Sequence, residues 1–167
     1  MIEIAKSAKI YEPVVIIKAD HDIKIGERCH IGQFCFIAAR QFIMMDEAEL
    51  CPQVTISGGG DVQIGERATI CYGVRIIPAT FSVKGMYMND SLHQRLPEMT
   101  EIIRGSITIG EGAYIGSNAV ICVTEKNPHI NIGEFSVIGA LSYIDKDVPP
   151  KMILYPDQQL HRKERLR

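Results

Sequence analysis

Long apolar runs are absent from this sequence. No stretch approaches the roughly 20 apolar residues that a membrane-spanning helix needs. The first six residues, Met1 to Lys6, show no charged-then-apolar pattern of a signal peptide. Excess charge is also lacking, because the formal net charge is only −2. Nucleic-acid and membrane-surface partners, which depend on concentrated positive charge, are therefore not favoured. We expect a cytoplasmic protein with a solvated basic tail over 161–167, the alternative for the tail being a phosphate-contacting role.

Paired cysteines and spaced histidines are lacking too. The five cysteines form no Cys-x-x-Cys pair, and an odd count in a reducing compartment predicts reduced thiols rather than a disulfide framework. A zinc site needs several ligands at compatible spacing, and the five histidines contain no His-x-x-x-x-His. We therefore expect no metal.

What the sequence does contain is isoleucine at intervals of six residues. A helix would turn positions six apart to opposite faces, whereas a prism with six-residue sides brings them to equivalent places in successive coils. The pattern predicts a parallel β-solenoid filled by stacked isoleucines. The runs are Ile25, Ile31, Ile37 and Ile43; Ile64, Ile70 and Ile76; Ile109, Ile115 and Ile121; and Ile132, Ile138 and Ile144.

Each of these isoleucines is often followed by glycine, and a small residue comes four places after it. Examples begin at Ile25, Ile64 and Ile109. We expect the glycine to supply backbone angles that other residues avoid, and the small residue to fill a crowded inward corner. Cys29 and Cys35 hold such positions, so they are interpreted as packing residues, with a reactive thiol as the alternative.

Three sides close a coil of about eighteen residues, so the chain should form about six or seven coils. Short breaks at 57–60 and 124–129 are interpreted as excursions at corners. Two prolines cannot supply ladder N–H groups, so Pro149-Pro150 should end the solenoid. The predicted division is a β-helix domain over 1–150 and a short tail over 151–167, for which a helix is one option.

One segment, 80–104, has no six-residue repeat, and long loops in compact repeat arrays are usually functional. It contains His93, with Tyr87, Asn89, Asp90 and Arg95 close by in sequence. Histidine can accept a proton from a hydroxyl and return it, which acyl transfer to an alcohol requires. His93 is therefore the catalytic candidate, and the alternative is a loop histidine that caps a turn. Asp90 could orient the imidazole or start a turn.

The stretches 109–121 and 138–150 resemble those of the hexapeptide-repeat acyltransferases, and the resemblance spans nearly the whole chain. This family includes galactoside, maltose and xenobiotic acetyltransferases and enzymes that decorate O-antigen, capsule and nucleotide-linked amino sugars. The resemblance implies a left-handed parallel β-helix and a homotrimer. It also implies that acceptor and acyl-CoA lie in clefts between subunits, covered by a loop that carries the catalytic histidine.

Carried over by motif, that loop is 80–104 and the histidine is His93, while Tyr87, Asn89, Asp90 and Arg95 would contact the acceptor. Two departures are visible: Ala79-Thr80-Phe81-Ser82 stands where many relatives have Ala-Thr-His-Pro, and 154–158 lacks their Gly-x-Pro-Ala. The implied contacts with acetyl-CoA are Ser117, Gly139, Ala140, Ser142, Lys146 and Arg162, with Arg165 as an alternative to Arg162.

Together these observations predict an acetyl-CoA-dependent O- or N-acetyltransferase with a sugar-like acceptor, acting in surface polysaccharide or nucleotide-sugar modification. Two other readings remain: a non-catalytic β-helix scaffold subunit and a carbonic-anhydrase-like metalloprotein. The sequence does not fix the acceptor, the choice between oxygen and nitrogen as nucleophile, or the length of the acyl chain.

Overall fold

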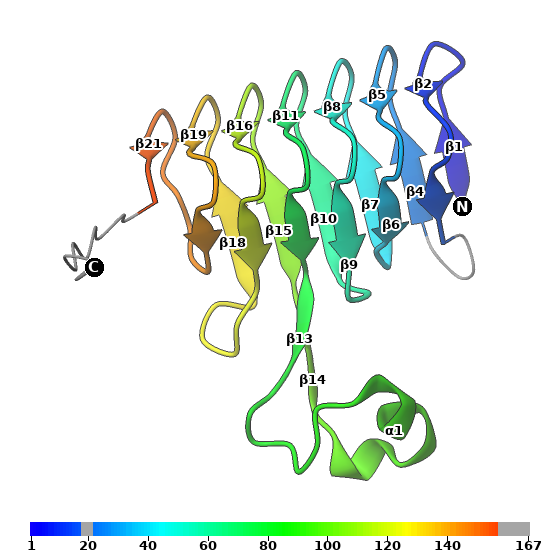
Figure 1. The fold of residues 1–167 in the computed structure, drawn as a ribbon, viewed down its shortest axis with the longest axis vertical. Coiled ribbons are helices and arrows are strands. Elements are labelled where there is room, and N and C mark those ends of the chain that lie inside the picture. The colour runs from blue at the N-terminus through cyan, green and yellow to red at the C-terminus, as the bar shows by residue number, and fades with distance from the viewer. Residues whose placement is uncertain (18–21, 157–167) are drawn as a thin grey trace, which may run out of the picture.

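The computed structural model describes residues 1–17 and 22–156, and these form a parallel β-helix of about seven coils (Figure 1). Three parallel sheets, here called A, B and C, make its sides, and a two-stranded ribbon stands apart from them. The predicted solenoid and coil count are confirmed. Sheet A contains β1 (Ile2–Ile4), β4 (Asp22–Ile25), β7 (Gln41–Met44), β10 (Asp61–Ile64), β15 (Ser106–Ile109) and β18 (His129–Ile132). Sheet B contains β2 (Lys9–Ile10), β5 (His30–Ile31), β8 (Glu49–Leu50), β11 (Thr69–Ile70), β16 (Tyr114–Ile115), β19 (Val137–Ile138) and β21 (Ile153–Leu154). Sheet C contains β3 (Val15–Ile16), β6 (Phe36–Ala38), β9 (Thr55–Ser57), β12 (Arg75–Ile77), β17 (Val120–Cys122) and β20 (Tyr143–Ile144).

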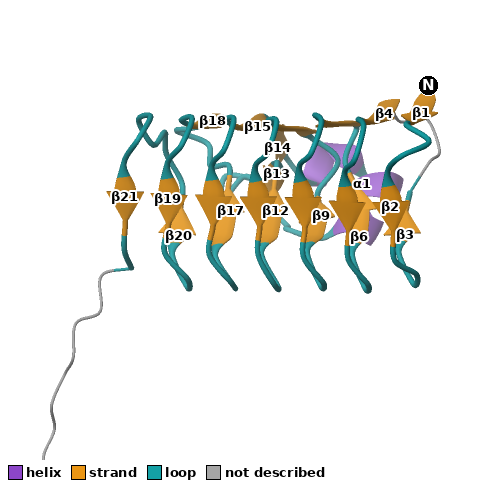
Figure 2. Cartoon of the chain, turned by 90° about the horizontal axis from the view of Figure 1, so that it is seen from above, coloured by secondary structure: helices purple, strands orange, loops and turns teal. Residues whose placement is uncertain are grey.

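The coils stack in sequence order along one axis (Figure 2). Each strand therefore pairs with the equivalent strand of the coil before and the coil after, as β12 does with β9 and β17. Successive coils bury each other, as expected of a repeat that cannot cover its own apolar side.

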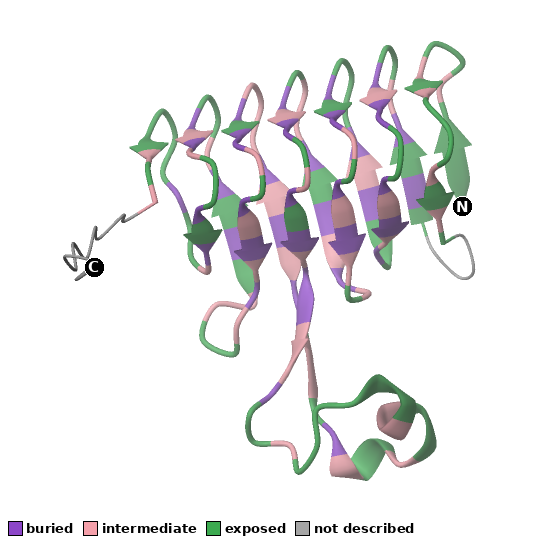
Figure 3. Cartoon of the chain, viewed as in Figure 1, coloured by how far each residue is buried: buried purple, intermediate pink, exposed green. Residues whose placement is uncertain are grey.

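Isoleucine fills the interior, and most of the predicted positions are confirmed. Ile31, Ile76 and Ile121 are completely buried, and burial is concentrated in the middle coils (Figure 3). The prediction for Ile43 is wrong. Its side chain lies on the outer surface of β7, while Phe42 and Met44 on either side point inward.

The error at Ile43 comes from one corner of the prism. The corners from sheet A to B and from B to C keep strict six-residue spacing, but the corner from C to A varies in length. It takes in extra residues in the coils up to β18, and it is shorter in the last coil, where Val148 follows Ile144 and lies opposite Ile132. Both predicted excursions, 57–60 and 124–129, and the long loop lie at this C–A corner, which is the lower edge of the solenoid in Figure 1. All insertions therefore gather on one edge.

Glycine after the inward isoleucine serves close stacking rather than unusual backbone angles. A Cβ on Gly65 would lie 2.6 Å from the backbone nitrogen of Glu111 in the next coil, and Gly65 has no positive φ. Positive φ occurs two places later, at Arg67 (56°), and at the equivalent Arg28 (55°). The expected role of the glycine is thus corrected: the next coil leaves no room for a side chain.

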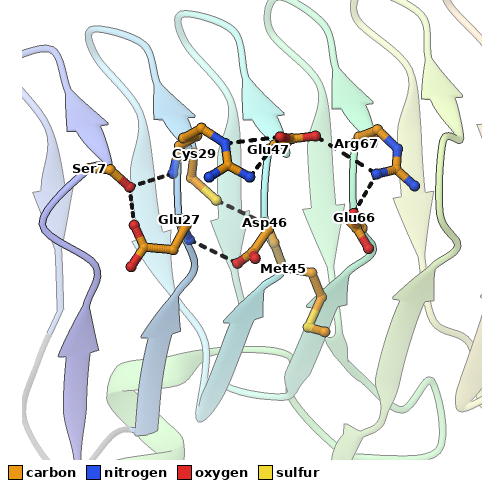
Figure 4. Close-up of polar contacts among 9 residues, drawn as sticks. Ser7, Glu27, Cys29, Met45, Asp46, Glu47, Glu66 and Arg67 are labelled. Atoms are coloured by element: carbon orange, nitrogen blue, oxygen red, sulfur yellow. Dashed lines mark hydrogen bonds and ion pairs between the residues drawn. The ribbon is translucent and has the colours of Figure 1, made fainter.

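Charged side chains stack along the corner between sheets A and B (Figure 4). Arg28 Nε donates to Glu47 Oε1 at 2.9 Å, and Arg67 pairs with Glu66 and with Glu111 of the next coil. These side chains are 38–62% exposed, so solvent screens each ion pair and its contribution to stability is small. Because the pairs with Glu47 and Glu111 join successive coils, they favour one register of each coil on the next.

The solenoid ends later than the prolines predict. Strand β21 follows Pro149-Pro150 and pairs with β19, Ile153 opposite Val137. The prolines lie in a corner, where no ladder N–H is needed, and the chain then re-enters sheet B. The remainder of the predicted tail, with His161, Arg162 and Arg165, lies outside the described residues.

Candidate functional site

The long loop leaves the C–A corner on an antiparallel stem formed by β13 (Ala79–Phe81) and β14 (Ile102–Arg104). It carries a short helix, α1 (Asp90–Arg95), followed by a 3-10 turn, η1 (Pro97–Met99). The loop extends away from the solenoid, with α1 displaced toward the N-terminal coils (Figures 1 and 2). It therefore overhangs its own coils and projects where another molecule could lie.

Helix α1 begins here because Asn89 caps it. The Asn89 side-chain oxygen accepts from the backbone N–H of Leu92 at 2.9 Å, as an N-cap does. Asp90 is the first helical residue, and its carboxylate accepts from Gln94 Nε2 at 3.2 Å. Among the described residues, no hydrogen bond joins Asp90 to the His93 ring. Of the two predicted roles, Asp90 takes the one at the start of the turn rather than orienting the imidazole.

His93 is half-buried within the loop. Its Nδ1 lies 2.6 Å from Thr100 Oγ1, and the Thr100 hydroxyl also lies 3.4 Å from the carbonyl oxygen of Pro97. When that hydroxyl donates to Pro97, its oxygen accepts from a protonated Nδ1, and Nε2 keeps its lone pair. In that tautomer, Nε2 is the ring nitrogen that can accept a proton from a substrate.

The first of two hollows beside α1, here called the loop hollow, has a volume of about 330 Å³. Three of the four predicted acceptor residues, Tyr87, Asn89 and Arg95, line it together with Ser91 and Leu92. Tyr87 is 49% exposed, and no ion pair of Arg95 is found in the described chain. The loop hollow thus combines a cation, an aromatic ring and polar groups.

The second hollow, here called the stem hollow, has a volume of about 580 Å³. Asp90 lines this hollow and not the loop hollow, which the other three predicted acceptor residues line. The sequence does not predict this hollow, because the residues at 57–60 have only the pattern of a corner excursion. Its lining residues come from the stem, from the start of α1 and from two C–A corners of the solenoid: Ala38, Ser57, Gly58, Gly59, Ala79, Thr80, Phe81, Asp90 and Ile102.

A contact ties the loop to the neighbouring coil. The Lys84 ammonium pairs with Glu125, in the excursion after β17. That excursion is itself held by Asn127, whose Nδ2 donates to the carbonyl oxygen of Asp145 at 2.9 Å. The loop is therefore connected to the solenoid by its stem and by an ion pair.

The predicted acetyl-CoA contacts lie elsewhere on the chain. Ser142 and Lys146 line a third hollow of about 540 Å³ at the C-terminal end of the solenoid, beside Tyr143 and Tyr155. The buried Ser142 hydroxyl donates to the carbonyl oxygen of Gly139 at 2.7 Å, so it is already engaged within the chain. The Lys146 side chain is exposed.

Ser117 and Ala140 lie at the B–C corner, where the backbone N–H following Ala140 donates to the carbonyl oxygen of Ser117 at 3.0 Å. Gly139 lies against the last coil, since a Cβ there would be 3.1 Å from the carbonyl oxygen of Leu154. Arg162 lies outside the described residues. The whole width of sheet C separates Ser117 and Ala140 from the loop with His93, so one chain does not bring these two residues to His93. Lys146 follows β20 and lies at the C–A corner, as the loop does.

The outer faces of the sheets differ in character. Sheet A presents polar residues such as Gln63, Thr108 and Asn131. Sheet C presents a largely apolar face, and its outward side chains include Val15, Phe36, Ile77, Val120, Cys122 and Tyr143.

The cysteines fit the packing interpretation. Cys29 and Cys35 are buried, and burial raises the pKa of both thiols. Burial is also the main cause that raises the pKa of the Cys51 thiol to about 11. A raised pKa lowers the thiolate fraction at neutral pH, which argues against the alternative of a reactive thiol.

Within the part of the chain that the structure describes, no three histidine, cysteine or acidic side chains gather as metal ligands would. No helix there is long and apolar enough to cross a membrane.

No protein-family model matches the chain. Galactoside O-acetyltransferase of Escherichia coli is 35% identical over 117 residues, covering 61% of this chain and 53% of that protein. The bifunctional protein GlmU of a Hydrogenobaculum species is 30% identical over 132 residues, covering 77% of this chain and 22% of GlmU. The chain thus spans about half or less of the length of these relatives.

Among solved structures, AntD of Bacillus cereus, an N-acyltransferase in complex with dTDP-4-amino-4,6-dideoxyglucose and coenzyme A, superimposes with a TM-score of 0.70 at 20% identity, over 98% of this chain and 80% of AntD. A hexapeptide-repeat acetyltransferase of Vibrio cholerae gives 0.51 at 21% identity, over 89% of this chain and 65% of that one. These likenesses confirm the fold. By its six-residue repeat, its left-handed parallel β-helix and its sequence relatives, the chain is a relative of the hexapeptide-repeat acyltransferases, as its motifs predict.

Proposed function

We propose that this protein is an acyl-CoA-dependent acyltransferase that transfers an acetyl-type group to a sugar-like acceptor. The observation that carries the proposal is the single long loop. It interrupts an otherwise regular solenoid and places His93 and two hollows with polar and charged lining at one edge. A scaffold subunit would need none of these features. The related galactoside O-acetyltransferase supports the same activity.

The active unit in this proposal is a homotrimer that works in the cytoplasm, with the outer face of sheet C as the contact between subunits. Val15, Phe36 and Val120 supply apolar area on that face. Because Ser117 and Ala140 lie at the edge of sheet C opposite to His93, contact across this face would bring the loop of one subunit to these two residues of the next. Both halves of the site would then meet between subunits.

The donor in this proposal is acetyl-CoA. Lys146, with its exposed ammonium, would pair with a CoA phosphate, and Ser117 and Ala140 would offer corner backbone to the pantetheine arm. Gly139 and Ser142 would maintain the shape of the coil rather than bond the donor, because each is packed within the chain. Arg162 stays a prediction for the CoA phosphates.

The acceptor in this proposal is held by the loop. Tyr87 would pack against a sugar or base, and Asn89 and Arg95 would bind its polar or anionic groups. For a hydroxyl acceptor, His93 Nε2 takes the hydroxyl proton while the oxygen attacks the thioester carbonyl, and a backbone N–H of a coil stabilises the oxyanion. For an amine acceptor the nucleophile needs less help, because a neutral amine already attacks thioesters.

The test is acyl transfer to a panel of glycosides and nucleotide sugars, with release of free CoA as the readout. We expect saturable, acceptor-dependent release by the wild-type protein, and a CoA KM at least about 10-fold higher for Lys146→Ala, the loss expected of one charge-assisted contact. Lys126→Ala, which removes an exposed lysine from the solenoid outside the third hollow, is the matched control. No release with any acceptor, together with no binding of acetyl-CoA, would reject the proposal.

A further inference from the structure

The stem hollow carries one charged side chain, Asp90, and it is an anion. Its carboxylate has a single hydrogen bond among the described residues, the one from Gln94, and no cation pairs with it. A carboxylate offers about four acceptor positions. Most of the hydrogen-bonding capacity of Asp90 is therefore available to a molecule in the stem hollow.

Part of the wall of the stem hollow is glycine backbone. Gly58 and Gly59 have φ values of +123° and +75°, and a Cβ on Gly59 would meet no atom within 4 Å. Phe81 and Ser57 complete the wall with an aromatic ring and a hydroxyl. An apolar face with a few hydroxyl partners suits a sugar ring, and the missing side chains leave space for it.

We propose that the acceptor's nucleophile is an amine, that it is bound by Asp90 in the stem hollow, and that the reaction is N-acylation. This inference rests on the proposed acyltransferase function. Two observations favour nitrogen over oxygen. The Asp90 carboxylate attracts N–H donors and the positive charge that develops on nitrogen during attack. His93, the base that a hydroxyl would need, does not line the stem hollow, and neither does Thr100, which its Nδ1 contacts at 2.6 Å.

The step balances without a further reagent. The nitrogen lone pair forms a C–N bond with the thioester carbonyl carbon, and nitrogen becomes positively charged beside Asp90. The C–S bond then breaks, and the proton lost from nitrogen is matched by the proton that the CoA sulfur gains. The products are an amide and free CoA.

The experiment compares matched sugars that differ only in an amino or a hydroxyl group at C2, C3 or C4, each as methyl glycoside and as dTDP-linked sugar. We expect kcat/KM for at least one amino sugar to exceed that of its hydroxyl partner by about 100-fold or more. Asp90→Asn should lower that value by about 30-fold or more, on the scale of losing one preorganised electrostatic partner. Glu98→Gln, the control, removes a charge from the same loop outside the stem hollow. It should leave kcat/KM for the amino sugar within about twofold of the wild-type value.

A second variant changes the shape of the stem hollow and leaves its charge unaltered. Gly59→Asn accepts the positive φ and adds a side chain where space is open, so the fold should tolerate it. We expect the acceptor KM to rise about fivefold or more, with acetyl-CoA binding unchanged. Transfer to hydroxyl members only, transfer to neither member while acetyl-CoA still binds, or full amine activity in Asp90→Asn would overturn the inference; the last two leave the acyl-CoA site itself standing.

Discussion

Truncation of an inward isoleucine should lower the free energy of unfolding far more in a middle coil of the solenoid than in a terminal coil. Ile76 is completely buried and lies in register between Ile56 and Ile121 of the coils on either side. Ile76→Ala removes three carbons, about 2.4 kcal/mol at about 0.8 kcal/mol each, before any cavity cost. We expect the free energy of unfolding to fall by about 3–4 kcal/mol. Ile16 is only half-buried and has a coil on one side only, paired with Ile37, so Ile16→Ala should cost about 1 kcal/mol.

The assay is urea unfolding at one fixed protein concentration, since subunit association would otherwise shift the midpoint. With a slope of about 2 kcal/mol per M, Ile76→Ala should lower the midpoint by about 1.5–2 M and Ile16→Ala by about 0.5 M. Ile76→Val, which loses one carbon, should fall between wild type and Ile76→Ala. Equal losses at the two sites would refute the reasoning, because they would mean that stacking by neighbouring coils does not set the stability of each coil.

Three further predictions follow from the loop, a corner and a thiol. His93→Ala should lower the turnover of hydroxyl acceptors by about 100-fold or more, which is the scale of losing a general base. The turnover of amine acceptors should fall by less than about tenfold, and Michaelis–Menten kinetics on both acceptor types will show whether the two losses differ. Gly105→Ala should lower stability by about 1–3 kcal/mol because its Cβ would overlap the carbonyl oxygen of Pro128, and an unchanged thermal midpoint would contradict that contact. Burial raises the pKa of the Cys51 thiol to about 11, so the folded protein binds this proton more tightly than the unfolded chain does. The stability that this thiol contributes is therefore complete below about pH 9 and is lost as the pH rises toward 11. In Cys51→Ala the free energy of unfolding should fall less steeply between pH 8 and pH 11, as measured by unfolding curves across this range. A pH dependence equal to that of the wild type would contradict the raised pKa of Cys51.

Much of the fold is readable from sequence because the solenoid is one-dimensional. The six-residue spacing of Ile109, Ile115 and Ile121 survives at two of three corners, so local pattern and global fold agree there. At the C–A corner the spacing varies, and counting by six places Ile43 inside, although the corner before it holds one residue more. Spacing alone does not show which side of a strand faces inward once a corner changes length.

The candidate site is less readable because its parts are distant in sequence. The loop stands out by its lack of repeats, and Tyr87, Asn89 and Arg95 do meet in one hollow. The stem hollow, in contrast, is lined by both Asp90 and Gly59, and no spacing or motif in the sequence relates these two residues. Three consecutive glycines at 58–60 are the one available signal, since such a run marks backbone kept free of side chains.

A thioester donor must bind to the outside of the prism if this protein is an acyltransferase, and thermal unfolding with and without acetyl-CoA measures that binding. At a concentration about 100 times its Kd, a ligand that binds only the folded protein adds about 2.7 kcal/mol of stability. For a chain of 167 residues this corresponds to a rise in Tm of about 5–10 °C. We predict a saturable rise of that size with acetyl-CoA and with CoA. An unchanged Tm at millimolar acetyl-CoA would mean that the folded protein does not bind this donor.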